Sequence, residues 1–285
     1  MKKGRQRIQQ FLDRIYTVIS KNDMRILPGH LAFFFIISII PIVSLLGFLS
    51  SFVPVSDQSV LETMQNAFPK EVLDFFVPIA TAKMGVHNAV IYIASAFILA
   101  SNGAYSMIIT SNELYKTKPT NWIRKRIKSV FLTIVMISLI MFIIIVPGFG
   151  NLIINWISKI DMPQAIMHQI NYIYMILKWP FAILFIFFNI KILYTMSPDD
   201  KIPSHSVNKG ALFTTVLWTV VTSIYSYYAT NIANYDKFYG SLSSLLVLMF
   251  WMYLLSYIFV IGMALNASLK PKETLPKTES IKDAN

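Results

Sequence analysis

The stretch LAFFFIISIIPIVSLLGFLSSFV, residues 31–53, carries no charged side chain. A helix needs about 20 predominantly apolar residues to cross the hydrocarbon core of a bilayer, so this stretch predicts a transmembrane helix. A cleavable signal peptide has a shorter apolar region, of about 7–15 residues. Because a long basic segment also precedes Leu31, we expect a membrane span that the protein retains.

Five more apolar stretches follow the first. They are Ala89–Ile109, Val130–Val146, Tyr174–Met196, Ala211–Tyr228 and Leu242–Ala267. Charged residues make up 14% of the chain, whereas they make up about a quarter of a soluble domain. We predict an all-α, polytopic membrane protein with six transmembrane helices. Its third span should end at Pro147, because proline interrupts a helix.

The spans divide the chain into three parts. Residues 1–27 form a basic amphipathic segment, and residues 28–269 form the six-helix transmembrane domain. Residues 270–285 form a polar tail that lacks the apolar residues for a core, and we predict that it is disordered.

Lysine and arginine alternate in density from one connection to the next. The N-terminal segment, the C-terminal tail and the connections after the second and fourth spans hold 20 of them, against 4 in the other three connections. Cytoplasmic loops carry this excess in membrane proteins. We therefore predict that both ends of the chain are cytoplasmic. The same bias accounts for the net charge of +11 without a nucleic-acid partner.

Three segments outside the spans have apolar residues at helical spacing. Residues 54–88 and 151–172 predict amphipathic helices on the outer side, either on the membrane surface or packed on the bundle. On the basic N-terminal segment one stripe is apolar, and it comprises Ile8, Phe11, Leu12, Ile15 and Val18. Such a helix suits contact with anionic lipids of the inner leaflet.

Few residues have the types and spacings that catalysis or metal binding requires. The chain has no cysteine, and its four histidines are far apart and fall on opposite sides of the predicted membrane. Asp199-Asp200, beside Lys201, predicts a solvated turn rather than a catalytic pair. The usual excess of lysine and arginine in cytoplasmic loops explains the basic run Arg124–Lys128, although such a run is also able to bind phosphates. We expect no catalytic residues, no metal site and no cofactor.

Polar residues inside spans are costly, so they are the first candidates for function. In the fifth span four of them lie at intervals of four, three and four residues, which places them on one helical face; they are Thr215, Thr219, Thr222 and Ser226. This face either packs against other helices or lines a substrate cavity, and both interpretations stay open.

Three more polar residues are candidates for the same cavity: Ser38 in the first span, Asn102 in the second and Asn266 in the last. Asn102 adjoins a small-residue face that lets another helix approach closely, formed by Ala96, Ala100 and Ala104. Pro41 leaves the carbonyl of Ile37 without its helical donor and predicts a kink. No span has a central Asp or Glu, so no carboxylate proton relay is predicted.

Short motifs in order along the chain carry a family resemblance. They are His30-Leu31-Ala32-Phe33, Ser38-Ile39-Ile40-Pro41, Ala100-Ser101-Asn102, Asn112-Glu113-Leu114-Tyr115, Tyr194, Pro198, Pro203, Gly210-Ala211, Trp218, Tyr235, Tyr239-Gly240-Ser241-Leu242, Trp251-Met252-Tyr253, Gly262 and Asn266-Ala267. Over residues 28–269 this set resembles the YihY/virulence factor BrkB family. The resemblance implies a six-helix protein of the bacterial inner membrane. Members were formerly labelled ribonuclease BN, a label for which these residues give no support.

The chain departs from the family pattern near the end of its last span. Members commonly carry Gly-Ala-Glu-x-Asn-Ala there, whereas this chain has Gly262-Met263-Ala264-Leu265-Asn266-Ala267. Ala264 therefore stands where the resemblance implies an acidic residue. A mechanism that uses this acid as a proton or cation site is not expected.

Two functional hypotheses follow from these features. The predicted kink and the polar and small-residue faces favour a transporter or exporter of a small solute, ion or lipid-like molecule. The absence of charge within the spans favours a non-transporting scaffold or envelope-assembly factor instead. A membrane-tethered ribonuclease is a remote third hypothesis, because no set of metal-binding carboxylates is present.

Overall fold

The computed structural model describes residues 9, 13–20, 22–50, 89–118, 120–157, 164–231 and 239–269. In these residues the chain is all-helical, and its long helices are α2 (Asp23–Ser50), α5 (Ala89–Tyr115), α6 (Trp122–Ile157), α7 (Gln164–Met196), α8 (Asn208–Asn231) and α10 (Ser243–Ser268). Short 3-10 turns, η2 (Ser204–Val207) and η3 (Gly240–Leu242), precede α8 and α10. Each predicted apolar stretch coincides with one long helix, so the all-α class is confirmed.

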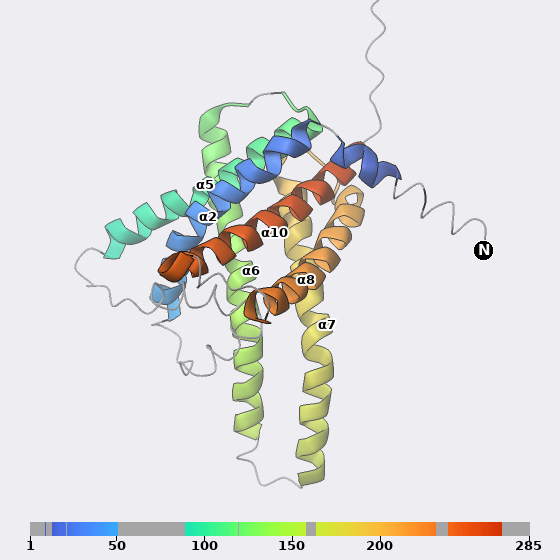
Figure 1. Cartoon of the computed structure of the whole chain (residues 1–285). Helices are drawn as coiled ribbons and strands as arrows, with labels where there is room; N and C mark the ends of the chain where they lie inside the picture. The colour runs from blue at the N-terminus through green and yellow to red at the C-terminus, as the bar shows by residue number, and fades with distance from the viewer. Residues whose placement is uncertain are drawn as a thin grey trace, which may run out of the picture.

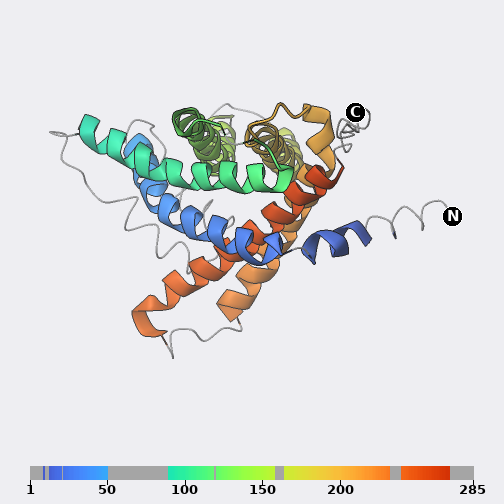
Figure 2. The same ribbon diagram turned by 90° about the horizontal axis from the view of Figure 1, so that it is seen from above.

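The six long helices form a closed ring in which neighbours along the chain are also neighbours in space. The contacts run from α2 to α5, α6, α7, α8 and α10 in turn, and α10 returns to α2. Figure 1 shows α10 crossing the middle of the molecule between α2 and α8, and Figure 2 shows the same crossing from above. Helix α10 also contacts α5, so it packs against helices on more than one side of the ring.

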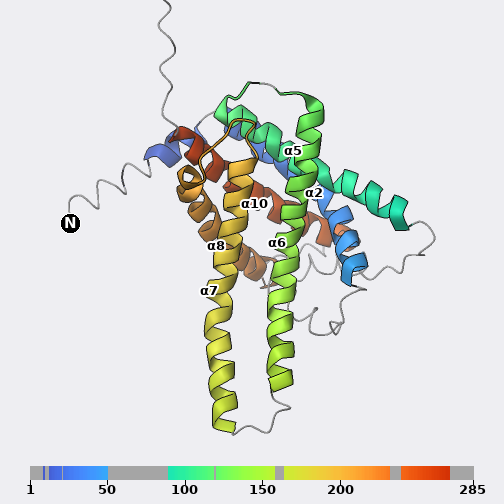
Figure 3. The same ribbon diagram turned by 180° about the vertical axis from the view of Figure 1, so that it is seen from behind.

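Helices α6 and α7 form a hairpin that extends beyond the other helices (Figures 1 and 3). They have 36 and 33 residues. The prediction that a span ends at Pro147 is wrong, because α6 stays helical to Ile157. A proline removes one helical hydrogen bond, which membrane helices tolerate where neighbours pack alongside. The separate amphipathic helix predicted over residues 151–172 is also wrong, since its described residues extend α6 and α7.

Helix α2 continues through two prolines, Pro28 and Pro41. Figure 2 shows that α2 curves along its length, while a kink centred on Pro41 stays a prediction. The helix begins at Asp23, so the last residues of the predicted N-terminal segment belong to it. Just before α2, residues 13–19 are helical and Val18 is buried in the main core. This part of the N-terminal segment therefore packs on the bundle.

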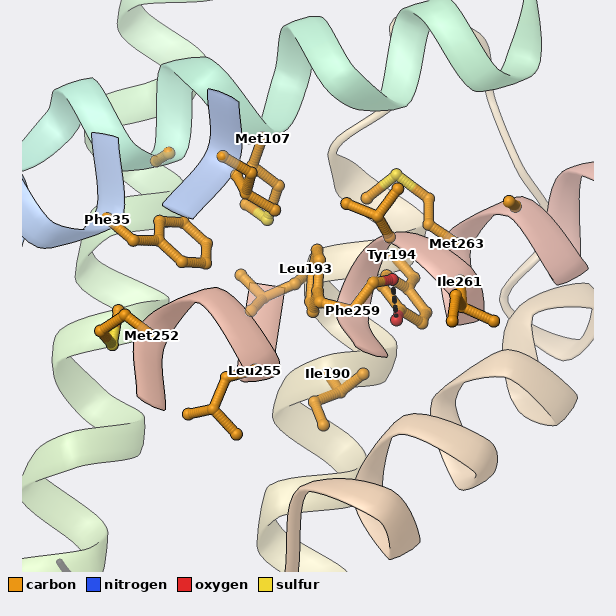
Figure 4. Packing of buried hydrophobic residues seen from close by; sticks show 14 of the residues in the cluster. Phe35, Met107, Ile190, Leu193, Tyr194, Met252, Leu255, Phe259, Ile261 and Met263 are labelled. Carbon is orange, nitrogen blue, oxygen red and sulfur yellow. Dashed lines mark hydrogen bonds between the residues drawn. The ribbon is translucent and has the colours of Figure 1, made fainter. Parts of the chain in front are cut away.

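The core is centred on Phe259 of α10, which is fully buried. Its ring centroid lies 4.6 Å from that of Tyr194, 5.9 Å from that of Trp218 and 6.4 Å from that of Phe35. Figure 4 shows Phe259 and Tyr194 among apolar side chains that include Leu193 and Met263. Aromatic rings from α2, α7 and α8 thus meet on α10. In a bilayer, close packing of this kind holds helices together.

The starts of α2, α6 and α8 lie at the same end of the ring as the ends of α5, α7 and α10. Three contacts define it: His30 with Ser106 at 3.0 Å, Lys128 with Asp199 at 3.1 Å, and Gly210 with Asn266 at 2.8 Å. The first joins α2 to α5, the second joins α6 to the chain after α7, and the third joins α8 to α10. The six helices therefore alternate in direction.

Four described segments are long and apolar enough to cross a membrane, and they are Asp23–Leu45, Ile93–Tyr115, Trp179–Met196 and Ser243–Ser268. Of the other two long helices, α6 opens on cations and α8 carries threonines and serines. The predictions for residues 54–88, for Ile8, Phe11 and Leu12, and for the tail 270–285 lie outside the described residues.

Candidate functional site

Buried polar side chains are the candidate functional residues of this bundle, because apolar surroundings make each one costly. In the described part of the chain they form three main groups. The first is a crossing of α7, α8 and α10, and the second surrounds Asp199 after α7. The third lies on α5 and α10 and consists of polar atoms without a partner.

At the crossing, the backbones of α8 and α10 meet where Gly210 faces Gly262. A Cβ atom at Gly210 would overlap the carbonyl oxygen of Gly262, and one at Gly262 would overlap the hydroxyl of Thr214. Glycine therefore makes this close approach possible. The buried Asn266 side chain accepts a hydrogen bond from the backbone N–H of Gly210 at 2.8 Å, which fastens the start of α8 to the end of α10.

Tyr194 brings α7 into the same crossing. Its phenol donates a hydrogen bond to the carbonyl oxygen of Phe259 at 2.7 Å, drawn as the dashed line in Figure 4, and lies 2.7 Å from the hydroxyl of Thr214. A buried tyrosine normally needs such a partner for its hydroxyl. Tyr194 thus connects three helices through one oxygen atom.

Two aromatic residues of α8 donate to carbonyl oxygens of α10 in the same way. The indole of Trp218 donates to Leu255 at 2.9 Å, and the phenol of Tyr225 donates to Val247 at 2.8 Å. These bonds extend the attachment of α8 to α10 well beyond the glycine contact.

The predicted polar row of α8 faces neighbouring helices. Thr215 is fully buried, and its hydroxyl donates to its own helix at the Ala211 carbonyl. Thr219 donates to the carbonyl of Thr215 at 3.0 Å, and Thr222 accepts a hydrogen bond from the Trp251 indole at 3.3 Å. Ser226, also in α8, is partly buried. These bonds are those of packed helices, and a cavity role for the row stays a prediction.

Ser38 of α2 inserts into the hydrogen-bond ladder of α5. Its hydroxyl accepts from the backbone N–H of Gly103 at 2.7 Å and donates to the carbonyl of Leu99 at 3.5 Å. A Cβ atom at Gly103 would lie only 2.9 Å from the Ser38 oxygen. The predicted small-residue face of α5 is confirmed, since its alanines are buried and α5 packs on α2.

Asn102 joins α5 to α6. Its side-chain oxygen accepts from the guanidinium of Arg126 at 2.9 Å, and the same guanidinium donates to the Ile98 carbonyl at 2.9 Å. Arg126 therefore bridges two helices, a role that the predicted positive-inside bias did not include.

Asp199 is not in a solvated turn, so that prediction is wrong for this residue. Its side chain is only 5% exposed. Its carboxylate accepts hydrogen bonds from Asn112 at 2.8 Å, from Lys128 at 3.1 Å and from Thr120, and its backbone N–H donates to the Asn112 side chain. These donors come from the end of α5, the following connection and the start of α6. The adjacent carboxylate of Asp200 is exposed, as expected.

Lys128 is the cation of this cluster. Its ammonium group also donates to the carbonyls of Ser197 at 2.8 Å and Pro198 at 2.7 Å, so it caps the end of α7. Burial lowers the pKa of Lys128, and the hydrogen bond and charge of Asp199 oppose that shift. Burial would raise the pKa of Asp199, but hydrogen bonds from Thr120 and Lys128, with the charge of Lys128, lower it overall. Asp199 is therefore ionised at neutral pH.

The third group consists of buried polar atoms that have no hydrogen-bond partner among the described residues. They are Thr110 Oγ1, Ser111 Oγ and Tyr115 Oη on α5, and Ser256 Oγ and Asn266 Nδ2 on α10. Serine and threonine hydroxyls are able to turn to the carbonyls of their own preceding turn. The phenol of Tyr115 lies too far from its own backbone to do so. Tyr115 is therefore the strongest candidate for contact with a polar solute.

The predicted cavity residues do not meet at one place. Ser38 lies between α2 and α5, Asn102 between α5 and α6, and Thr222 and Asn266 at separate levels of the contact between α8 and α10. The prediction missed Thr110, Ser111, Tyr115 and Ser256. Thr110, Ser111 and Tyr115 follow Ile109, where the second span was expected to end, although α5 continues to Tyr115. Ser256 lies within the predicted sixth span, where helical spacing does not show whether a hydroxyl has a partner.

Comparison with known proteins gives consistent matches over nearly the whole chain. The model of the family described as Virulence factor BrkB matches residues 15–284. The chain is 26% identical over 274 residues to the ribonuclease-like protein YfkH of Bacillus subtilis (strain 168), covering 93% of this chain and 97% of the relative. It is 25% identical over 281 residues to a UPF0761 membrane protein of Vibrio vulnificus (strain YJ016), covering 95% and 86%. No solved structure matches the chain.

Proposed function

Because this chain belongs to the virulence factor BrkB family, we propose that it is a six-span protein of the bacterial inner membrane that moves a small polar solute, an ion or a lipid-like molecule. The membrane character itself follows from the apolar helices and from the similarity to membrane proteins. The number of spans, the orientation and the transport activity are the proposed elements.

Helix length and direction support six crossings with both ends in the cytoplasm. The shortest long helix, α8, has 24 residues, which at 1.5 Å per residue extends about 36 Å and exceeds a hydrocarbon core of about 30 Å. The described parts of the connections rich in lysine and arginine lie at the end of the ring where α5, α7 and α10 finish. The positive-inside bias assigns this end to the cytoplasm.

The observation that carries the transport proposal is the set of unpaired polar atoms on α5 and α10. A hydroxyl or amide buried without a partner costs about 1–3 kcal/mol, so a bundle that only needs to pack would replace these groups with apolar ones. The two helices are in contact. A polar solute that passes between them would supply the missing hydrogen bonds.

A scaffold or envelope-assembly role is the second candidate, and a specific observation favours it. Ser38, Asn102 and Thr222 all bond to neighbouring helices rather than converging. That arrangement is the one expected of polar residues that hold a bundle together.

A nuclease role receives no support from the acidic pair, although one relative is named a ribonuclease-like protein. Metal-assisted phosphate chemistry needs carboxylates with free coordination sites. The Asp199 carboxylate instead accepts hydrogen bonds from Asn112, Thr120 and Lys128.

Reconstitution tests the transport proposal. The full chain is placed in liposomes, and the fluxes of potassium and protons and the transfer of fluorescently tagged phosphatidylglycerol between leaflets are followed. We expect the wild type to move at least one probe, and Tyr115→Phe to slow it without loss of folded protein. A wild type that moves none of them, and that co-purifies with a stable partner, would support the scaffold instead.

A further inference from the structure

A hollow of about 500 Å³ lies where α6 begins and α7 ends. Its lining residues are Asn121, Ile123, Arg124, Ile127, Lys128 and Met196. Neither the packing of the core nor the unpaired polar atoms on α5 and α10 involves this place. It lies next to the Asp199 cluster, because Lys128 belongs to both.

The walls of the hollow are apolar side chains that remain exposed. Ile127 is 69% exposed, and Ile123 and Met196 are also exposed. Exposed apolar surface next to charged residues marks a contact with a membrane or another molecule. Trp122 is 68% exposed one residue before Ile123, and tryptophan at the end of a membrane helix is typical of the bilayer interface.

Two apolar stripes lead from the hollow along the hairpin. On α6, Ile123 and Ile127 continue into Phe131 and Ile134, at intervals of four, four and three residues. On α7, Met196 continues back through Ile192, Phe188 and Leu184 at intervals of four. All these side chains are exposed, and each set lies on one helical face. Figure 3 shows α6 and α7 side by side over this length, and both stripes start from residues that line the hollow, so two apolar tracks lead away from it along the hairpin.

Two cationic side chains, Arg124 and Lys128, are part of the lining of the hollow. The ammonium group of Lys128 is committed to Asp199 and to two carbonyls. Arg124 is exposed and forms no ion pair in the described part of the chain. Its guanidinium is therefore available to an anion, and a guanidinium binds a phosphate through paired hydrogen bonds.

We propose that this hollow binds an anionic phospholipid, with its phosphate at Arg124 and its two acyl chains along the stripes of α6 and α7. A cation above paired apolar tracks matches the head group and the two tails of one lipid molecule. The site rests only on the location of the chain in a membrane and holds whether or not the protein transports anything. With the orientation proposed above, the lipid belongs to the inner leaflet.

Native mass spectrometry of the full chain in a mild detergent tests the site. The protein is incubated with equal amounts of phosphatidylglycerol and phosphatidylcholine that have identical acyl chains. We expect the wild type to retain phosphatidylglycerol preferentially and Arg124→Gln to reduce that retention about fivefold, the size of effect of one basic residue at an anionic surface. Arg25→Gln is the matched control, because Arg25 is also exposed and is also the third residue of its helix.

A second variant separates a lipid from a free phosphate. Ile127→Asn keeps the cation and removes an exposed apolar wall, so it should weaken retention of both lipids, with folding intact. Competition with soluble glycerol phosphate should have little effect. Equal losses in Arg124→Gln and Arg25→Gln would show diffuse charge attraction and overturn the proposal. Unchanged retention in Ile127→Asn, or displacement of the lipid by glycerol phosphate, would overturn it as well.

Discussion

The crossing of α7, α8 and α10 and the second half of α5 are both buried and both polar, yet they differ in how their polar atoms are used. At the crossing, Tyr194 bonds to Thr214 and Phe259, and Gly210 bonds to Asn266. On α5, the side-chain hydroxyls of Thr110, Ser111 and Tyr115 have no partner among the described residues.

This difference separates two roles that burial alone does not distinguish. Paired polar groups fix the relative positions of helices, because each bond demands one geometry. Unpaired groups lower stability, and the proposed polar path between α5 and α10 would give them partners. Asn266 belongs to both regions, since its oxygen is bound to Gly210 while its nitrogen has no partner in the described part of the chain. It therefore marks where the paired crossing meets the unpaired set.

The largest expected effect comes from breaking the closest approach at the crossing. In Gly210→Ala the new methyl group overlaps the Gly262 carbonyl, which is backbone and cannot turn aside. Overpacking of this kind costs about 3 kcal/mol, and thermal unfolding in detergent should show that loss. Gly29→Ala is the control, because no atom lies within 4 Å of its Cβ position. Equal melting temperatures for both variants would contradict the close approach.

The next largest effect is expected in the Asp199 cluster, which joins the end of α5 to the start of α6. Asp199→Asn removes the anion that Lys128 faces, and loss of a charged hydrogen bond costs roughly 2 kcal/mol. The lowered pKa of Asp199 also gives a pH dependence: its stabilisation is complete above the ordinary value of 3.8 and is lost as pH falls below it, through the folded-state pKa. Acid titration of unfolding should show this component in the wild type and not in the variant.

Patterns that repeat along the helices were predictable from the sequence, and contacts between helices were not. Apolar runs of span length predicted the six long helices, and the alanines of α5 predicted a close approach by another helix, which is α2. Pro147 misled the prediction, because a proline within a packed hairpin does not end a helix. The burial of Asp199 was missed, since its partners Asn112 and Lys128 are remote in the sequence.

The same limit applies to the candidate site. Helical spacing placed Thr215, Thr219 and Thr222 on one face, but it could not tell whether a hydroxyl bonds to its own helix, to an indole or to nothing. The resemblance motif that ends in Tyr115 was the one sequence signal for the unpaired end of α5.

A pair of tyrosine variants sharpens the comparison directly. Tyr194→Phe leaves the Thr214 hydroxyl and the Phe259 carbonyl without their partner, which costs about 1–2 kcal/mol. Tyr115→Phe removes an unpaired hydroxyl and should leave stability unchanged or slightly raised. The two melting curves are measured in the same detergent. A larger loss in Tyr115→Phe than in Tyr194→Phe would reverse the assignment of the two regions.

The smallest effect is expected on the polar row of α8. Thr222→Val deletes the acceptor of the Trp251 indole and should cost about 1 kcal/mol. Thr219→Val affects only a bond to its own helix and should stay within about 0.5 kcal/mol of the wild type. Chemical unfolding in mixed micelles measures both. If both retain full stability but lose flux in liposomes, the row lines a cavity after all.

Thiol labelling tests most directly whether water reaches the unpaired residues of α5 and α10. Because the chain has no native cysteine, only the introduced cysteine reacts. Single variants Ser111→Cys and Ser256→Cys probe the unpaired set, and Ser38→Cys and Thr214→Cys probe paired, packed positions. A buried thiol away from water is inert. We expect a charged, water-soluble thiol reagent to modify Ser111→Cys and Ser256→Cys several-fold faster than the packed pair. Equally slow modification at all four positions would contradict a polar path between α5 and α10.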